Sequence, residues 1–238
     1  MDLVQTFEKF VFGMECLGCG APNVRLDPWL CPACMAELGR LSKASQFPEA
    51  DVYCLFPMRQ LTRRLIHCLK YKTVPGMAMY LVRRSSAVEG GEIGLLFAEL
   101  PRPLFFVPVP LHRARYRERG YNQAEKIAAA LATVTGGKVC RWLRRRKFVV
   151  SQTKLSREER ELNVAGAFAA NLPKELPRHG TVVVVDDVFT TGATTKSCLG
   201  AFGSNFPLPL RVCTLLFEEP VTAVVDFAAD CRKSWDDC

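Results

Sequence analysis

Hydrophobic positions fall into short apolar runs and helical stripes that alternate from about residue 50 onward. The strands predicted from these runs are Val52–Phe56, Leu104–Val109, Lys138–Leu143, Phe148–Val150, Thr181–Val185 and Arg211–Phe217. The helices predicted from 3.6-residue spacing and capping residues are Leu61–Lys70, Met77–Val82, the stretch that follows Asn122, and Thr194–Phe202. Strands and helices in this order predict an α/β fold, with a mostly parallel sheet covered by helices on both faces.

The run Val182–Val185 has no polar alternation, so both of its faces are expected to be buried, as in a central parallel strand. Asp186 and Asp187 follow directly. In an open α/β sheet, ligands bind beyond the carboxyl ends of the strands. The two carboxylates are therefore candidates for a binding site.

A loop of small and hydroxyl residues comes next, made of Thr190, Thr191, Gly192, Ala193 and Thr194. Glycine lets backbone approach a ligand closely, and loop N–H groups before a helix suit a phosphate. The two acids would repel that phosphate, but they suit ribose hydroxyls or a hydrated Mg²⁺. Together these residues predict a site for a ribose 5-phosphate group. The alternative is a strand that ends in two solvated acids and a threonine-rich turn.

Two CxxC pairs lie near the N-terminus, formed by Cys16 with Cys19 and by Cys31 with Cys34. Each pair can direct two thiolates at one ion, so their spacing predicts a four-sulfur structural zinc site. Two redox dithiols are the alternative, and four thiolates leave no open position for zinc catalysis. The chain has eleven cysteines and no signal-peptide pattern, so a reducing cytoplasm is expected, with the other cysteines in apolar surroundings. No apolar run approaches the roughly 20 residues of a membrane span.

Positive charge is concentrated in one segment of the chain. Lys and Arg number 32 against 24 Asp and Glu, yet residues 112–160 alone carry a net charge of +10. Such a segment attracts phosphates, either of a small ligand or of a nucleic acid, unless it is only a solvated loop. The aromatic residues among these charges, Tyr116, Tyr121, Trp142 and Phe148, would also suit a track for single-stranded nucleic acid.

The stretch Thr181–Thr195 resembles the phosphoribosyl pyrophosphate (PRPP) binding motif of type I phosphoribosyltransferases: an apolar strand, two acids and a TGxT-like loop. Further stretches of note are Val107–Arg113, Arg119–Ala124, Gln152–Arg160 and Asn163–Phe168. With the four-cysteine module, they make the chain similar to the ComF/GntX family over roughly residues 10–220. That family combines a zinc finger with a phosphoribosyltransferase-like domain, and some members serve DNA uptake in natural transformation.

The resemblance implies a zinc module over residues 1–45 and a phosphoribosyltransferase-like domain over residues 46–238. Within the domain it implies a hood at 46–103, a core at 104–220 and a loose tail at 226–238. By position, Asp186 and Asp187 would be the catalytic acids that hold the ribose, and Thr190–Thr194 would wrap the 5′-phosphate. The Pro108–Arg113 turn, with Val109, Pro110 and Arg113, would contact pyrophosphate. A lid over Ser151–Asn163 would include Gln152, Thr153, Lys154 and Arg157.

Two functions follow from this resemblance. The first is an enzyme that uses PRPP with Mg²⁺ and releases pyrophosphate on transfer to an acceptor that the sequence does not indicate. Thr190 stands where hypoxanthine-type enzymes have a third acid, which argues against their purine mechanism. The second is a DNA-uptake factor that binds single-stranded DNA and a helicase partner without transferase turnover. The oligomeric state stays open.

Overall fold

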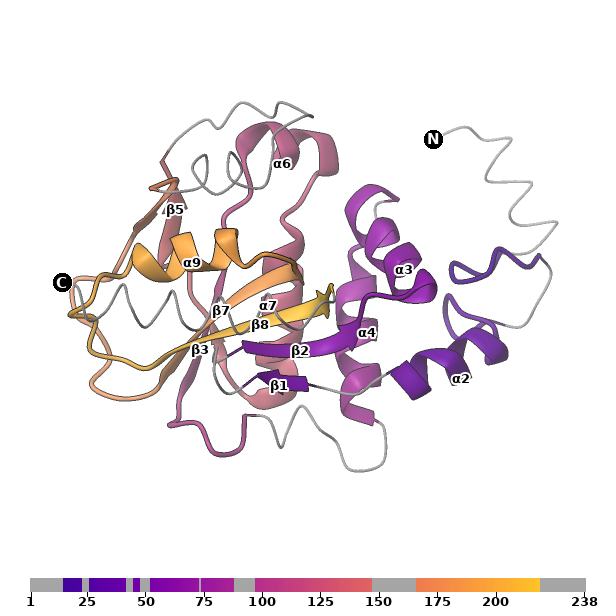
Figure 1. The fold of residues 1–238 in the computed structure, drawn as a ribbon, viewed down its shortest axis with the longest axis horizontal. Coiled ribbons are helices and arrows are strands. Elements are labelled where there is room, and N and C mark those ends of the chain that lie inside the picture. The colour runs from indigo at the N-terminus through magenta and orange to yellow at the C-terminus, as the bar shows by residue number, and fades with distance from the viewer. Residues whose placement is uncertain are drawn as a thin grey trace.

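The computed structural model describes residues 15–22, 26–41, 45–47, 52–72, 74–87, 97–146 and 166–218, and the statements below concern these residues (Figure 1). Its helices are α2 (Pro32–Leu41), α3 (Gln60–Tyr71), α4 (Gly76–Ala87), α6 (Arg113–Arg119), α7 (Gln123–Thr135) and α9 (Ala193–Gly200). Its strands are β1 (Ser45–Phe47), β2 (Val52–Pro57), β3 (Leu104–Pro108), β4 (Lys138–Val139), β5 (Leu143–Arg145), β6 (Phe168–Ala170), β7 (Thr181–Phe189) and β8 (Leu210–Phe217).

Six strands form the main sheet, in the order β1-β2-β8-β7-β3-β4. All neighbouring pairs are parallel except β1 with β2. The four valines Val182–Val185 of β7 lie between β3 and β8 and are fully buried, as their lack of polar alternation predicts. The remaining two strands, β5 and β6, form a separate antiparallel pair.

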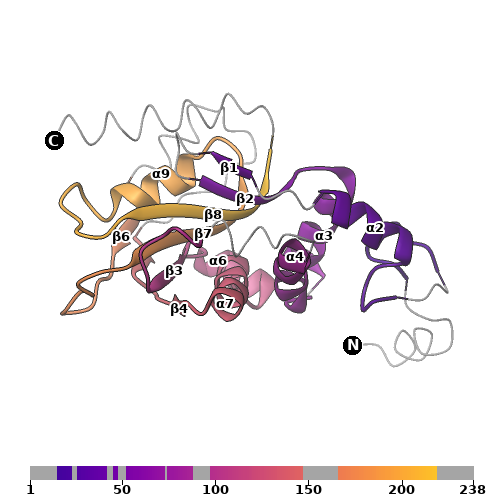
Figure 2. The ribbon, with the colours of Figure 1, turned by 90° about the horizontal axis from the view of Figure 1, so that it is seen from below.

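Helices cover both faces of the main sheet. Figure 2 shows α9 on one side of β7 and β8, with α3, α4 and α7 on the other. The β5–β6 pair lies on the α9 side, because Leu143 and Phe168 share a buried cluster with Cys198 of α9. On the opposite side, Leu65 of α3, Met77 of α4 and Ile127 of α7 share a second cluster. Alternate residues of β7 enter the two clusters, which is why the strand is apolar throughout.

The four-cysteine module packs directly onto the rest of the chain. Cys16, Leu30 and Leu38 belong to the same buried cluster as Leu61 and Leu65 of α3. Trp29 also makes an edge-to-face contact with Tyr80 of α4, their ring centroids 5.5 Å apart. The module therefore shares its core with α3 and α4.

The predicted fold class is confirmed: a parallel sheet is flanked by helices, and a small four-cysteine module precedes it. Within this fold, β7 extends to Phe189 and so contains the two acids, whereas the prediction ended the strand at Val185. The predicted strand Lys138–Leu143 is replaced by β4 and the start of β5, which belong to different sheets. The structure also contains α6, a helix that the apolar periodicity of the sequence does not predict.

The predicted domain boundaries stay a prediction. Within the expected hood, β2 pairs with β8 in the main sheet, while α3 and α4 pack on the α7 side, near the carboxyl ends of the strands (Figure 1). The tail at 226–238 and the predicted strand Phe148–Val150 lie outside the described residues. In the described part of the chain, the helices are too short or too polar to cross a bilayer.

Candidate functional site

The two acids lie at the carboxyl edge of the sheet. The parallel partner β3 ends opposite Val185, just before Asp186, while β8 continues beside the acids as far as Phe217. The turn that follows β3 therefore occupies the position next to Asp186 where β3 would otherwise continue. The acids, the turn after β3 and the loop after β7 thus lie at one end of the sheet, where parallel α/β folds bind ligands.

The charge of Asp187 is balanced by a lysine from a helix that is distant in the sequence. Its carboxylate oxygen Oδ1 lies 3.0 Å from the ammonium of Lys70, in the last turn of α3. Both side chains are mostly buried, with 15% and 22% of their surface exposed. Helix-end lysines often only complement the helix dipole. Lys70 instead makes a direct ion pair with a candidate ligand-binding acid.

Asp186 lies in a different environment from its neighbour. Burial, followed by the negative charge of Asp187, raises its pKa to about 7. The backbone N–H of Asp187, which donates to Asp186 Oδ1 at 2.8 Å, opposes this shift, as do the charges of Lys70 and Arg145. The pair thus holds one acid that is ion-paired and another that exchanges its proton near neutral pH.

The loop after β7 enters α9 through a left-handed glycine. Gly192 is the N-cap of α9 and is left-handed, with φ 76°, so a side chain is disfavoured there. No side-chain hydrogen bond caps the helix at this residue. The Thr195 hydroxyl donates to the Gly192 carbonyl at 2.8 Å, and Thr191 Oγ1 accepts from the Ala193 N–H at 3.4 Å. Thr190 is exposed, while Thr191 and Thr194 are half-buried.

The turn after β3 is held firmly in place. The Val109 N–H donates to the Val185 carbonyl, and the Val109 carbonyl accepts from the Asn122 side chain, both at 2.9 Å. Val109 is itself buried, Pro110 is half-buried and Arg113 is exposed. The imidazole of His112 caps α6 by accepting from the Ala114 N–H at 3.2 Å. The expected pyrophosphate turn therefore lies beside the acid-bearing strand, and its own hydrogen bonds fix its shape.

The lid residues named from the sequence, Gln152, Thr153, Lys154 and Arg157, lie outside the described residues. Their role stays a prediction. The last described residue before them is Arg146, and the chain is described again from Gly166, next to β6. The β5–β6 pair therefore fixes both ends of the segment that contains the expected lid.

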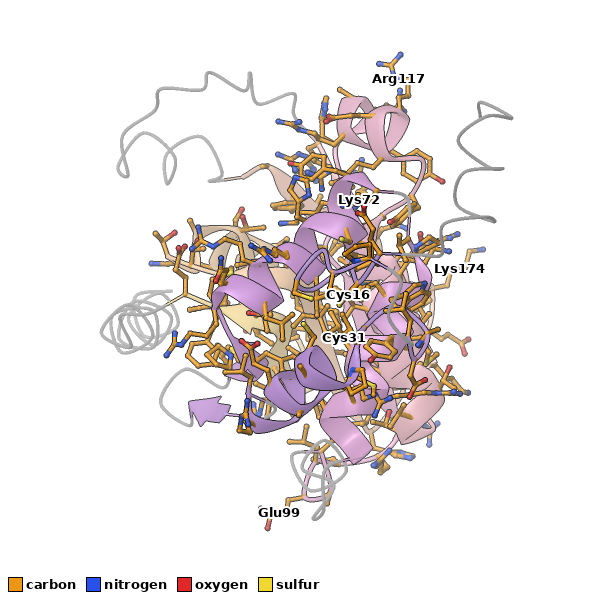
Figure 3. The ribbon with its side chains drawn as sticks, turned by 90° about the vertical axis from the view of Figure 1, so that its right-hand side faces the viewer. Cys16, Cys31, Lys72, Glu99, Arg117 and Lys174 are labelled. Carbon is orange, nitrogen blue, oxygen red and sulfur yellow. The ribbon has the colours of Figure 1, made fainter. Side chains whose placement is uncertain are left out.

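The four cysteines come together as their spacing predicts. The sulfur atoms of Cys16, Cys19, Cys31 and Cys34 all lie within 4.8 Å of one another, and those of Cys19 and Cys31 are 3.8 Å apart. Tetrahedral zinc–sulfur bonds of about 2.3 Å place sulfurs about 3.8 Å apart, so the donor set fits zinc. Burial would raise the pKa of Cys16, but hydrogen bonds from backbone N–H groups of the module outweigh it and lower that pKa to about 6. Figure 3 shows Cys16 and Cys31 close together.

Several arginines of the basic segment already have partners within the protein. In its described part, Arg115 pairs with Glu118 at 2.8 Å, and Arg141 pairs with Glu125. Arg119 stacks over the Tyr71 ring, 5.0 Å from its centroid. Since α6 is helical, its four arginines point in different directions instead of lining one side.

Two charged residues near the acid pair, Lys70 and Arg145, do not stand out in the sequence. Lys70 lies in the last turn of a helix, where a lysine that only complements the helix dipole would look the same in the sequence. Arg145 stands in a run of basic residues, Arg144–Lys147, which looks uniformly exposed. Strand alternation is the signal that separates it, because Arg145 then shares the inward face of Leu143 while Arg144 faces solvent.

No protein family model matches the chain. Competence protein F of Haemophilus influenzae is 34% identical over 105 residues, 40% of this chain and 42% of that protein. DNA utilization protein YhgH of Salmonella typhi is 38% identical over 100 residues, 40% of this chain and 41% of that protein. The chain thus matches only about two-fifths of the length of these relatives.

Among solved structures, adenine phosphoribosyltransferase from Saccharomyces cerevisiae, complexed with an imino-altritol bisphosphate and adenine, aligns with a TM-score of 0.38 and 11% identity. The alignment covers 83% of this chain and 93% of that one. The resemblance predicted from the motifs is confirmed at the level of relatives: over two-fifths of its length, this chain is homologous to Competence protein F and DNA utilization protein YhgH.

Proposed function

We propose that this chain binds the ribose 5-phosphate part of PRPP, together with Mg²⁺, at the acid pair and the Thr190–Thr194 loop. The observation that carries the proposal is the position of both groups at the end of β7, beyond the edge where β3 stops. Ribose hydroxyls donate hydrogen bonds to carboxylates, and the α9 N-terminus favours a phosphate. Mg²⁺ would bind the diphosphate and keep most of its waters near the acids.

The reaction that this ligand supports is phosphoribosyl transfer. The bond between the anomeric carbon and pyrophosphate breaks as a bond to the acceptor forms, and the acceptor loses a proton to solvent or to a nearby base. Positioning and electrostatic stabilisation of the leaving pyrophosphate supply the rate enhancement. Thr190 has no carboxyl to take that proton, so we do not propose a purine base as acceptor.

Calorimetric titration of PRPP with Mg²⁺ tests the proposal. Wild-type protein should bind at micromolar concentrations, and Asp187→Asn should bind at least tenfold more weakly, since a carboxylate that accepts hydrogen bonds from the ribose is lost. Glu218→Gln is the control, because Glu218 is exposed and pairs only loosely with Arg63 at 3.5 Å. Absence of wild-type binding would reject the proposed function.

A second function, binding of single-stranded nucleic acid, is favoured by one surface observation. Tyr116 of α6 is 50% exposed, and the exposed Arg141 lies close enough to interact electrostatically with it. Arg117 projects from α6, away from the rest of the molecule (Figure 3). An exposed ring beside cations is the arrangement on which bases stack and phosphates bind.

Affinity for an oligothymidylate at several salt concentrations tests this second function. Arg117→Gln should lower both the affinity and the dependence of log K on log salt, since one phosphate contact is lost. Tyr116→Ala should lower the affinity but leave the salt dependence unchanged, because stacking carries no charge. Binding that ignores salt in the wild-type protein would contradict a phosphate-binding surface.

A further inference from the structure

Arg145 is the inward-facing member of its basic run. It ends β5 and lies opposite Phe168 of β6, where its guanidinium carbon is 5.2 Å from the ring centroid. Its neighbours Arg144 and Arg146 are exposed, whereas Arg145 is half-buried. Its side chain is therefore directed under α9, toward the strand that carries the acids.

One nitrogen of the Arg145 guanidinium, Nε, is buried without a hydrogen-bond partner among the described residues. Nor does the guanidinium form an ion pair with a described carboxylate, although Asp186 is near enough to influence it electrostatically. A buried guanidinium nitrogen without a partner costs about 1–3 kcal/mol or more, so an ordered water, an ion or a ligand is expected to supply one.

Asp186 is a weak counter-ion for this arginine. Its carboxylate oxygen already accepts the backbone N–H of Asp187, and burial keeps its pKa near neutrality, so its negative charge is incomplete. Lys70 does not compete for the same space, because it pairs with Asp187. The α9 side of the acid pair thus contains one cation that forms no ion pair with a described carboxylate.

We propose that Arg145 is an anion-binding residue of this site, where it donates hydrogen bonds from its guanidinium to a phosphate group of the ligand. The inference rests on the proposed function, which places a phosphorylated ribose at the acid pair. Arg145 Cζ lies over the Phe168 ring, and the planar guanidinium fork of arginine can bind phosphate oxygens in pairs. The phosphate belongs either to the ribose 5-phosphate or to the diphosphate, and the test distinguishes the two.

The test compares wild-type protein with Arg145→Gln and Arg144→Gln by calorimetric titration. The four ligands are PRPP with Mg²⁺, ribose 5-phosphate, inorganic pyrophosphate and unphosphorylated ribose. Arg145→Gln should weaken binding of phosphorylated ligands at least tenfold, and Arg144→Gln should change it less than twofold, because Arg144 faces solvent. A loss confined to ribose 5-phosphate assigns Arg145 to the 5-phosphate, and one confined to pyrophosphate assigns it to the diphosphate.

The outcomes separate this inference from the proposed function. If wild-type protein binds PRPP and Arg145→Gln binds it equally well, the function stands and the inference is rejected. If PRPP does not bind but pyrophosphate or ribose 5-phosphate does, with a loss in Arg145→Gln, the function is rejected and the inference stands. Binding of no phosphorylated ligand rejects both, and an equal loss for ribose means that Arg145 only supports Asp186.

A folding control keeps the result interpretable. Thermal unfolding of each variant shows whether Arg145→Gln is folded. If it is not, Arg145→Lys replaces it, because lysine keeps the charge and loses the paired N–H groups. The lysine variant should then bind phosphorylated ligands several-fold more weakly than wild type, and unchanged binding would reject the inference.

Discussion

The ammonium of Lys70 lies 3.0 Å from a carboxylate oxygen of Asp187, and this contact joins the last turn of α3 to the carboxyl end of β7. More than a hundred residues separate the two partners in the sequence. Nearby, Arg119 of α6 donates to the Tyr71 hydroxyl at 3.3 Å, and the Tyr121 hydroxyl donates to the Leu69 carbonyl. The end of α3 therefore contacts both the acid pair, through an ion pair, and the segment after the expected pyrophosphate turn, through two hydrogen bonds.

Loss of the Lys70 ammonium should destabilise the fold. Lys70→Gln leaves Asp187 without its ion pair in a mostly buried position, and we expect the free energy of unfolding to fall by about 1–3 kcal/mol. Urea denaturation measures this change. Lys72→Gln is the matched control, because Lys72 is exposed just beyond the same helix and should shift the free energy by less than about 0.5 kcal/mol. Equal midpoints for the two variants would contradict the ion pair.

The raised pKa of Asp186 predicts a pH-dependent stability. An unfolded chain releases this proton near pH 4, whereas the folded chain holds it until about pH 7. The folded state therefore loses stability relative to the unfolded state as the pH rises from about 4 to 7, and the full penalty applies above 7. Asp186→Asn has no such proton, so its stability relative to wild type should increase from pH 5 to pH 8. Urea midpoints at both values measure it, and a constant difference would show that the pKa is ordinary.

The local part of the site could be predicted from the sequence because local motifs specify it. Two CxxC pairs determine which sulfurs converge, and four valines before two acids identify a central strand and its carboxyl end. Glycine and threonines likewise predict a loop followed by a helix, and α9 begins at Ala193, directly after Gly192. None of these features needs knowledge of a distant partner.

The rest depends on contacts between distant segments. β7 continues to Phe189 because β8 runs beside it, although Asp186 and Asp187 end the apolar run. Lys70 meets Asp187 only because α3 crosses the end of the sheet. Sequence periodicity has no information about such pairings, so it leaves the charge partners of the acids unassigned.

The helix α6 was missed for a different reason. It contains no buried residue, so it has no apolar stripe to detect. Local signals at its ends could have revealed it: His112 caps its N-terminus, and the left-handed Gly120 ends it with φ 77°. Its four arginines consequently point in different directions around the helix. Instead of a continuous basic track, only a smaller basic surface near Tyr116 remains in the described part of the chain.

Replacement of Gly18 should disturb the four-cysteine module. A Cβ at this residue would lie 2.8 Å from both Cys34 Sγ and Leu61 Cδ1, which is closer than real contacts allow. Gly18→Ala should therefore weaken zinc retention against a chelator about tenfold or more, and it should lower the melting temperature, because the module shares its core with α3. Zinc content per chain and thermal unfolding measure both effects.

Gly39→Ala provides the control for this change. Gly39 lies in α2 of the same module, and a Cβ there meets no atom within 4 Å. Alanine is the better helix former by about 1 kcal/mol, so this variant should retain added zinc as wild type does and be equally or more stable. If both variants retain zinc equally, the tight contact between Gly18 and Cys34 is not required for metal binding.

The left-handed backbone of Gly192 should matter for the ligand beyond its effect on stability. Alanine in that conformation costs about 1–2 kcal/mol, and the strain would be relieved by moving the loop that begins α9. Gly203→Ala is a matched control, because Gly203 has nearly the same φ, 79°, and an open surrounding. In urea, Gly192→Ala should lose at least as much stability as Gly203→Ala, because Gly192 is buried and Gly203 is exposed. Only Gly192→Ala should weaken ribose 5-phosphate binding, by tenfold or more in calorimetry. Equal affinity in the two variants would place the phosphate away from this loop.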